Sequence, residues 1–143
     1  MWNYIWPLLL VVGANTFYNI CAKGTPDAIH PFASLIFTYL TAAALSMALF
    51  VATSDSKNLL AEARHANWTT FAFGLAIVGL ELGYINLYRA GWNVSVGPMV
   101  ANTLLAVVLL AVGALLYKEI LHWNQIVGAL LCIGGLVLIN RKF

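Results

Sequence analysis

The chain has 143 residues, of which 62% are apolar and only 8% are charged. A soluble domain carries about 25% charged residues, which keep its surface in water. The composition therefore excludes a soluble globular protein, and a net charge of +2 without a basic cluster gives no sign of nucleic-acid binding. We expect one all-α membrane domain over residues 1–143.

Two apolar stretches, residues 2–22 and 30–53, open the chain. The first has no basic start and no small-residue cleavage site, so we expect a retained membrane span and not a signal peptide. The second begins at His30-Pro31, where a proline in the first helical turn costs no hydrogen bond. The following loop, up to residue 67, holds the densest charge and is mildly amphipathic, which allows a short surface helix.

Three further stretches, residues 68–90, 94–117 and 123–140, complete a set of five. Each offers close to the roughly 20 apolar residues that a membrane helix needs. They are too continuous for barrel strands, which alternate over about ten residues. All five tryptophans lie at the ends of these stretches, where aromatic side chains gather at the membrane interface. The sequence therefore predicts five transmembrane helices.

The basic residues divide almost evenly between the two sides of such a bundle. Because successive spans alternate in direction, four of the seven Lys and Arg residues fall on one side and three on the other. The positive-inside rule then selects no orientation. Either the chain inserts in both orientations, or features other than charge fix one. The first side holds Lys23, Arg89, Arg141 and Lys142, and the second holds Lys57, Arg64 and Lys118.

Glu81, near the middle of the third span, has the strongest functional implication. A charge at the centre of a bilayer costs about 3 kcal/mol, and Arg89 lies about 12 Å farther along the helix, too far for a direct pair. Glu81 is therefore protonated, faces water, or meets a partner on another helix. We favour a proton or cation-substrate site over a carboxyl bound by a neighbouring Asn or Tyr, because ionisable groups inside membranes are mostly functional.

The third span has two distinct faces. Helical spacing places Tyr84 and Tyr88 beside Glu81, where their rings can line a pocket for an organic cation or an amphipathic solute. The same tyrosines can instead be ordinary interfacial residues. Gly79 and Gly83 form a GxxxG pair on nearly the opposite face, a pattern that favours close helix packing.

Polar amides in the first and fourth spans are further pathway candidates. Asn15 lies in the first span, and Asn102 lies in the fourth, one turn after Pro98. We expect Pro98 to free a carbonyl and bend its helix, and transport pathways are built from such groups beside broken helices. The alternative is hydrogen bonding between helices that only holds the bundle together. For Asn19 and Asn86 we expect that structural role.

The fifth span carries a stripe of small residues, Gly128, Cys132 and Gly135. Their spacing favours close packing or a dimer interface over a ligand site. No metal, cofactor or catalytic motif accompanies the spans, since the sequence has no HExxH, GxSxG or Walker glycine loop. We therefore expect a protein that is not an enzyme and that holds no cofactor.

The last part of the chain resembles the final two helices of an EamA-like repeat of the drug/metabolite transporter superfamily. The similarity rests on a small and polar run before a proline, a glutamate that ends the helix, and a Gln-x-x-Gly pattern. A Gly-Ala-Asn run and a later lysine in the first span also fit the repeat. The residues concerned are Ser95 to Met99, Tyr117-Lys118-Glu119, Gln125, Gly128, Leu131, Gly134-Gly135, Gly13-Ala14-Asn15 and Lys23.

The resemblance implies a transporter of small metabolites or drugs, with a substrate cavity lined by the first, third and fourth helices. Most members carry two inverted repeats, whereas this chain carries one. The related small multidrug resistance proteins have four helices and a functional glutamate in the first, where this chain has no acid. Their coupling glutamate therefore corresponds to no residue here, and Glu119 is expected to cap its helix or bond to another.

Together these features predict a secondary active transporter, acting as an exporter across the cytoplasmic membrane. A single repeat needs an inverted partner, so we expect a homodimer, antiparallel if the chain inserts in both orientations. Two alternatives stay open. One is a flippase, or flippase subunit, for lipid-linked sugars. The other is a membrane assembly subunit that transports nothing itself.

Overall fold

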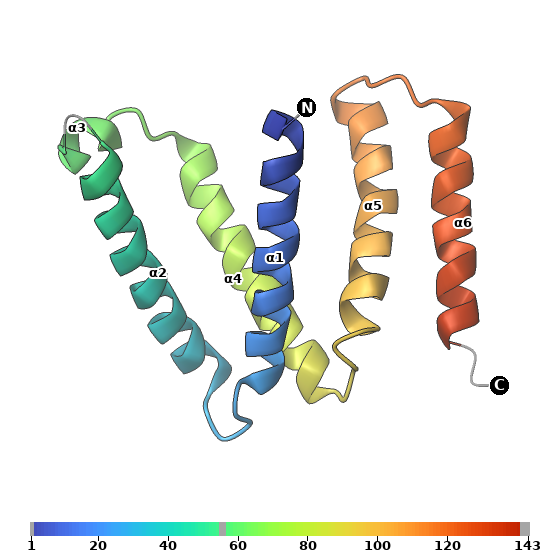
Figure 1. Ribbon diagram of the computed structural model, residues 1–143, viewed down its shortest axis with the longest axis horizontal. Coiled ribbons are helices and arrows are strands. Elements are labelled where there is room, and N and C mark those ends of the chain that lie inside the picture. The colour runs from blue at the N-terminus through green and yellow to red at the C-terminus, as the bar shows by residue number, and fades with distance from the viewer. Residues whose placement is uncertain (1, 55–56, 141–143) are drawn as a thin grey trace. The chain divides into compact units, whose positions relative to one another are not determined.

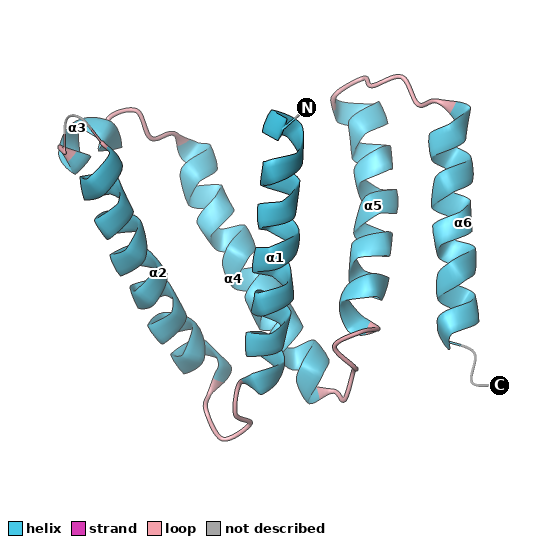
Figure 2. Ribbon diagram, in the orientation of Figure 1, coloured by secondary structure: helices cyan, strands magenta, loops and turns pink. Residues whose placement is uncertain are grey.

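A computed structural model describes residues 2–54 and 57–140, and all regular structure in these ranges is α-helical (Figure 2). Five long helices and one short one follow each other along the chain (Figure 1). They are α1 (Trp2–Gly24), α2 (Pro31–Thr53), α3 (Leu59–Ala63), α4 (Trp68–Arg89), α5 (Gly97–Leu116) and α6 (Trp123–Asn140).

Four of the described helices, α1, α2, α4 and α5, are long and apolar enough to cross a membrane. The apolar part of α6, Trp123–Ile139, is shorter. At 1.5 Å per residue it is about 26 Å long, slightly less than the roughly 30 Å of a hydrocarbon core. The five expected spans are thus confirmed in part, as four candidate spans and one shorter apolar helix.

Local sequence signals explain where several helices begin. Asn67 precedes α4, and its side-chain oxygen accepts a hydrogen bond from the backbone N–H of Thr69 at 3.0 Å. Asn58 caps the short surface helix α3 in the same way, through the N–H of Ala61 at 3.1 Å. Such side chains satisfy the free N–H groups of a first turn. The helix α2 begins at Pro31, as predicted.

The fourth span begins later than predicted, at Gly97 and not at residue 94. Pro98 therefore lies in the first turn of α5. A proline there breaks no hydrogen bond, because the carbonyl four residues earlier belongs to the preceding turn and not to the helix. The expectation that Pro98 bends the fourth span is wrong for this reason.

The chain forms two compact units, one up to Ala90 and one from Gly91 onward. Gly91 follows the end of α4 with a φ of +94°, a left-handed conformation that favours glycine. In the first unit α4 packs against both α1 and α2. In the second unit α5 packs against α6.

The interior of the first unit is small and includes polar groups. Most large apolar side chains of the helices are exposed, which suits helices surrounded by lipid. The side chains that are buried in the first unit come from all three packed helices. They are Asn19 of α1, Leu35 of α2, and Tyr84, Ile85 and Tyr88 of α4.

Candidate functional site

Glu81 lies on the face of α4 that packs against α1 and α2, and its side chain is half-buried. Its carboxyl group lies beside the phenol of Tyr39 from α2 and close to that of Tyr18 from α1. Both hydroxyl oxygens are buried; that of Tyr18 makes no hydrogen bond within the described residues, whereas that of Tyr39 lies within hydrogen-bonding reach of the Glu81 carboxyl. Glu81 thus meets neutral polar groups from two other helices, one of the arrangements that its position in mid-membrane requires.

A small cavity of about 90 Å³ lies beside Glu81. The three long helices of the first unit, α1, α2 and α4, all contribute to its wall. Hydroxyl-bearing residues are prominent there, together with the Glu81 carboxyl and two buried aliphatic side chains. The lining residues are Tyr18, Cys21, Ala22, Thr25, Ser34, Leu35, Thr38, Glu81 and Ile85.

A row of tyrosines continues from Glu81 toward the end of α4. Tyr18 and Tyr84 meet edge to face, with ring centroids 5.5 Å apart, and the centroid of Tyr88 lies 6.2 Å from that of Tyr84. The tyrosines and the glycine pair lie on different faces of α4, but the close packing expected of the glycines is not made within the described residues and stays a prediction. Gly79 and Gly83 are exposed on the other face, and a Cβ atom added at either would meet nothing within 4 Å.

Two asparagines of α1 and Tyr88 of α4 form a chain of hydrogen bonds. The Tyr88 hydroxyl donates to Oδ1 of Asn19 at 2.6 Å, and Nδ2 of Asn19 donates to Oδ1 of Asn15 at 2.7 Å. Asn15 is exposed, whereas Asn19 is only 6% exposed. Asn19 is therefore the asparagine that lies in the interior of the first unit. Asn86 is exposed and donates to the carbonyl of Leu82 within its own helix.

The end of the bundle next to Tyr88 is fastened by two basic residues. The Lys23 ammonium lies 5.7 Å from the centre of the Tyr88 ring and 3.5 Å from the Tyr88 carbonyl. Arg89 donates to the carbonyls of Pro26 and Ile29, at 3.1 and 2.7 Å, in the loop between α1 and α2. Its Nε atom also lies 3.5 Å from Asp27.

Sequence reasoning used Lys23 and Arg89 mainly as charges that indicate the side of the membrane, and it assigned no contact to either residue. Both stand in the last turn of a helix, where a cation is stabilised by the helix dipole. Their position in a last turn could have indicated a structural role from the sequence, but it does not identify the carbonyls that they bind. The two residues meet at the same end of the first unit, which agrees with their expected placement on one side of the membrane.

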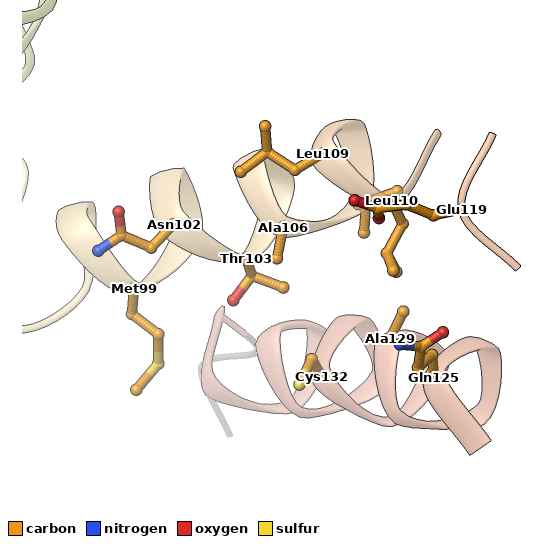
Figure 3. A pocket seen from close by; sticks show the side chains of 11 residues that line it. Met99, Asn102, Thr103, Ala106, Leu109, Leu110, Glu119, Gln125, Ala129 and Cys132 are labelled. Atoms are coloured by element: carbon orange, nitrogen blue, oxygen red, sulfur yellow. The ribbon is translucent and has the colours of Figure 1, made fainter. Parts of the chain in front are cut away.

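The second unit contains a larger cavity of about 740 Å³ between α5 and α6 (Figure 3). Met99 and Asn102 lie toward one end of it, and Glu119 and Gln125 lie toward the other. Its wall is mostly apolar. The lining residues are Met99, Asn102, Thr103, Ala106, Val107, Leu109, Leu110, Glu119, Gln125, Ala129 and Cys132. Of the predicted residues in this unit, Asn102 and Cys132 share this cavity.

Glu119 closes the end of α5. Lys118 adopts a φ of +54°, and this left-handed turn lets the backbone N–H of Glu119 donate to the Gly113 carbonyl at 3.0 Å. The carboxyl group lies over Gly113 itself, where a Cβ atom would be 2.5 Å from Oε2 of Glu119. The capping expected of Glu119 is therefore made by its backbone. Gln125 caps the start of α6 by accepting from the His122 N–H at 2.9 Å.

The glycines of the predicted small-residue stripe make no close contact within the described chain. A Cβ atom added at Gly128 or Gly135 would meet nothing within 4 Å. Their small size therefore serves no packing inside this unit. Their role at a helix or dimer interface stays a prediction.

Comparison with known families gives one result that covers almost the whole chain. Residues 2–141 match the EamA-like transporter family. No curated protein and no solved structure matches the chain. The match agrees with the apolar helices, the carboxyl group within a span and the resemblance noted in the sequence. The chain therefore belongs to the EamA-like transporter family and is a multi-pass membrane transporter of the drug/metabolite type.

Proposed function

We propose that this protein is a secondary active transporter that exports small metabolites or drugs across the cytoplasmic membrane, with Glu81 as its coupling group. The observation that carries the proposal is the half-buried Glu81 carboxyl inside a helix bundle of a transporter-family chain. The groups beside it are the neutral phenols of Tyr18 and Tyr39. A carboxyl in such a place can take up a proton and release it without a fixed ion pair to break.

Pathway residues in this proposal are polar groups on spans that belong to the transporter fold. Tyr84 and Tyr88 continue the polar row from Glu81, and Asn15 is the exposed end of the amide chain. Asn102 contributes an amide to the cavity between α5 and α6. The exposed Asn15 and the cavity-lining Asn102 support the assignment because such polar groups in a membrane helix are available to a solute. Tyr84 and Tyr88 are buried and enter the proposal only through their place in the row beside Glu81.

The transporter is proposed to work as a homodimer of two half-transporters, antiparallel if both orientations occur. One repeat needs an inverted copy to form two alternating access routes. The near-even division of Lys and Arg supports insertion both ways. Gly79 and Gly83 in the first unit, and Gly128 and Gly135 in the second, have open space where a second helix can approach.

The coupling role is tested by Glu81→Gln in liposomes with an imposed pH gradient. Glutamine keeps the size and removes the proton site, so we expect solute movement driven by the gradient to be lost. The matched control is Glu62→Gln, which removes an exposed carboxyl of the surface helix α3. If Glu81→Gln couples as well as the control, Glu81 is not the coupling group.

Membrane orientation is tested by single cysteines at position 56 and at the C-terminus. The background must carry Cys21→Ser and Cys132→Ser, because both native cysteines are exposed. Label reaching each site from both sides of the membrane is the result expected for dual insertion. Label from one side only at each site excludes an antiparallel dimer of this chain.

A flippase, or flippase subunit, for lipid-linked sugars is the second candidate, and the cavity between α5 and α6 favours it. That cavity is large enough for a drug-sized or lipid-sized apolar group, since ligand sites span about 300–1,000 Å³. Polar Glu119 and Gln125 at one end could meet a headgroup. Liposomes with a fluorescent lipid in one leaflet separate the candidates, because only a flippase speeds its transfer between leaflets.

A further inference from the structure

The cavity beside Glu81 presents oxygen lone pairs more than hydrogen-bond donors. Thr38 donates its hydroxyl proton to the Ser34 carbonyl at 3.1 Å, and Thr25 donates its own to the Cys21 carbonyl at 3.2 Å. Each hydroxyl has one proton, so these two oxygens can offer only lone pairs to the cavity. Their bonds to the preceding helical turn therefore make them acceptors for any occupant.

Three more oxygen-bearing side chains line the same cavity. Glu81 contributes a carboxylate, the ligand with most negative charge, and Tyr18 and Ser34 contribute hydroxyls that can rotate. The Tyr18 hydroxyl is buried without a partner. The remaining wall includes Leu35 and Ile85, which are 3% and 5% exposed and exclude water from that side. The chemistry matches an occupant that is a hard cation.

We propose that this cavity binds a sodium ion, ligated by Glu81 and the surrounding hydroxyl oxygens. One carboxylate balances one positive charge, whereas a divalent ion would leave a net charge within the membrane, which is costly. A volume of about 90 Å³ holds a small ion with one or two waters, each of about 30 Å³, and is too small for a drug-sized cation.

No cationic side chain of the chain lines this cavity within the described residues. Lys23 and Arg89 act at the end of the bundle, where they contact Tyr88 and the loop carbonyls. No cationic side chain therefore balances the Glu81 carboxylate in the cavity that these oxygen-bearing residues line, within the described part of the chain. A bound Na⁺ supplies that charge and engages the orphaned Tyr18 hydroxyl through its oxygen.

Binding of Na⁺ is measured on the purified full chain by thermal unfolding at fixed pH. Sodium chloride is compared with potassium and choline chloride at equal ionic strength. An ion that binds only the folded state raises Tm in a saturable way, and we expect a rise of a few degrees with Na⁺ alone. Glu81→Gln should abolish this rise.

The hydroxyl ligand is tested by Thr38→Val with Thr41→Val as the matched control. Thr41 lies on the same helix, is exposed like Thr38 and makes the same kind of bond, to the Phe37 carbonyl at 2.9 Å, but it does not line the cavity. We expect Thr38→Val to weaken Na⁺ binding at least about ten-fold, the size of one lost ligand. Thr41→Val should leave it unchanged, and Thr38→Ser should restore it if Thr38→Val folds poorly.

Two results would overturn the sodium site. Equal Tm shifts in all three salts would show an effect of ionic strength alone, and the cavity would then hold only water. Unchanged Na⁺ affinity in Thr38→Val would show that the cavity hydroxyls do not bind the ion. Any role of this ion in transport rests on the proposed function, but binding is measured without it. Saturable Na⁺ binding without solute movement would contradict the proposed transport function but not the sodium site. Solute transport without Na⁺ binding would contradict the sodium site but not the transport function.

Discussion

The hydrogen bond between Tyr88 and Asn19 joins α4 to α1, and Tyr88→Phe removes it with little other change. The donor and the acceptor are 2.6 Å apart, and their residues are 4% and 6% exposed. The ring remains in place, so the contacts with Tyr84 and with the Lys23 ammonium are kept. The variant therefore isolates one buried hydroxyl that bridges two spans.

The expected cost follows from what the bond leaves behind. Oδ1 of Asn19 loses its donor from the other helix and stays buried, while Nδ2 keeps its bonds to Asn15. An unsatisfied buried acceptor costs about 1–3 kcal/mol, and measured bonds between membrane helices average about 0.6 with a maximum near 1.7 kcal/mol. Taking both limits, we expect Tyr88→Phe to lower the free energy of unfolding by about 1–1.5 kcal/mol.

The assay is reversible unfolding of the purified protein in mixed micelles, followed by circular dichroism as the share of denaturing detergent increases. The matched control is Tyr84→Phe, one turn earlier on α4, because the Tyr84 hydroxyl makes no hydrogen bond within the described residues. A double-mutant cycle with Asn19→Ala should give a coupling energy of about 0.6–1.7 kcal/mol. If Tyr88→Phe is no less stable than Tyr84→Phe, the bond does not hold the two spans together.

Three other substitutions test separate parts of the two units. Arg89→Lys should lower the free energy of unfolding by about 1–2 kcal/mol, because a single ammonium cannot reproduce the bonds of the forked guanidinium to two loop carbonyls. Protease cleavage in the loop 25–30 should become faster, and an unchanged cleavage rate would show that Arg89 does not hold this loop. Gly113→Ala should lower the free energy of unfolding by less than about 1 kcal/mol, since the Glu119 carboxyl is the end of a flexible side chain and can move away. In a Glu119→Ala background this loss of stability should vanish, and a loss that persists there would have another cause. Pro98→Ala should leave the helical circular dichroism signal unchanged because the residue occupies a first turn, and a clear loss of signal would contradict that placement.

The positions of the helices were predictable from sequence because a bilayer accepts only segments of sufficient length and apolarity. Length and apolarity are enough to identify a span in lipid, and the predicted starts at residues 2, 68 and 123 agree with the structure. The start of the fourth span was three residues too early. Apolar residues 94 and 96 suggested helix there, but they precede Pro98, which ordinarily stands at a helix start.

The arrangement of the site was predictable only in part. Spacing alone placed Glu81, Tyr84 and Tyr88 on one face, because that depends on the geometry of a single helix. The partner of Tyr88 was not predictable in this way, since Asn19 is 69 residues distant in the sequence. A tertiary contact of that kind leaves no periodic signal. The left-handed turn at Lys118 was equally unmarked, because the residue there is not a glycine.

The hydrogen bonds that join Tyr88 and Arg89 to other parts of the first unit lie at one end of α4, whereas Glu81 meets tyrosines of α1 and α2 farther along the helix. Arg89 binds carbonyls of the loop before α2, and Asn19 and Lys23 of α1 contact Tyr88 in the last turn of α4. A tilt that preserves these contacts must pivot about that end. The helix α4 has 22 residues and is about 33 Å long, so a tilt of about 10° displaces its other end by about 6 Å. With that end held, a small rotation of α4 is therefore magnified into a displacement of several ångströms at its opposite end.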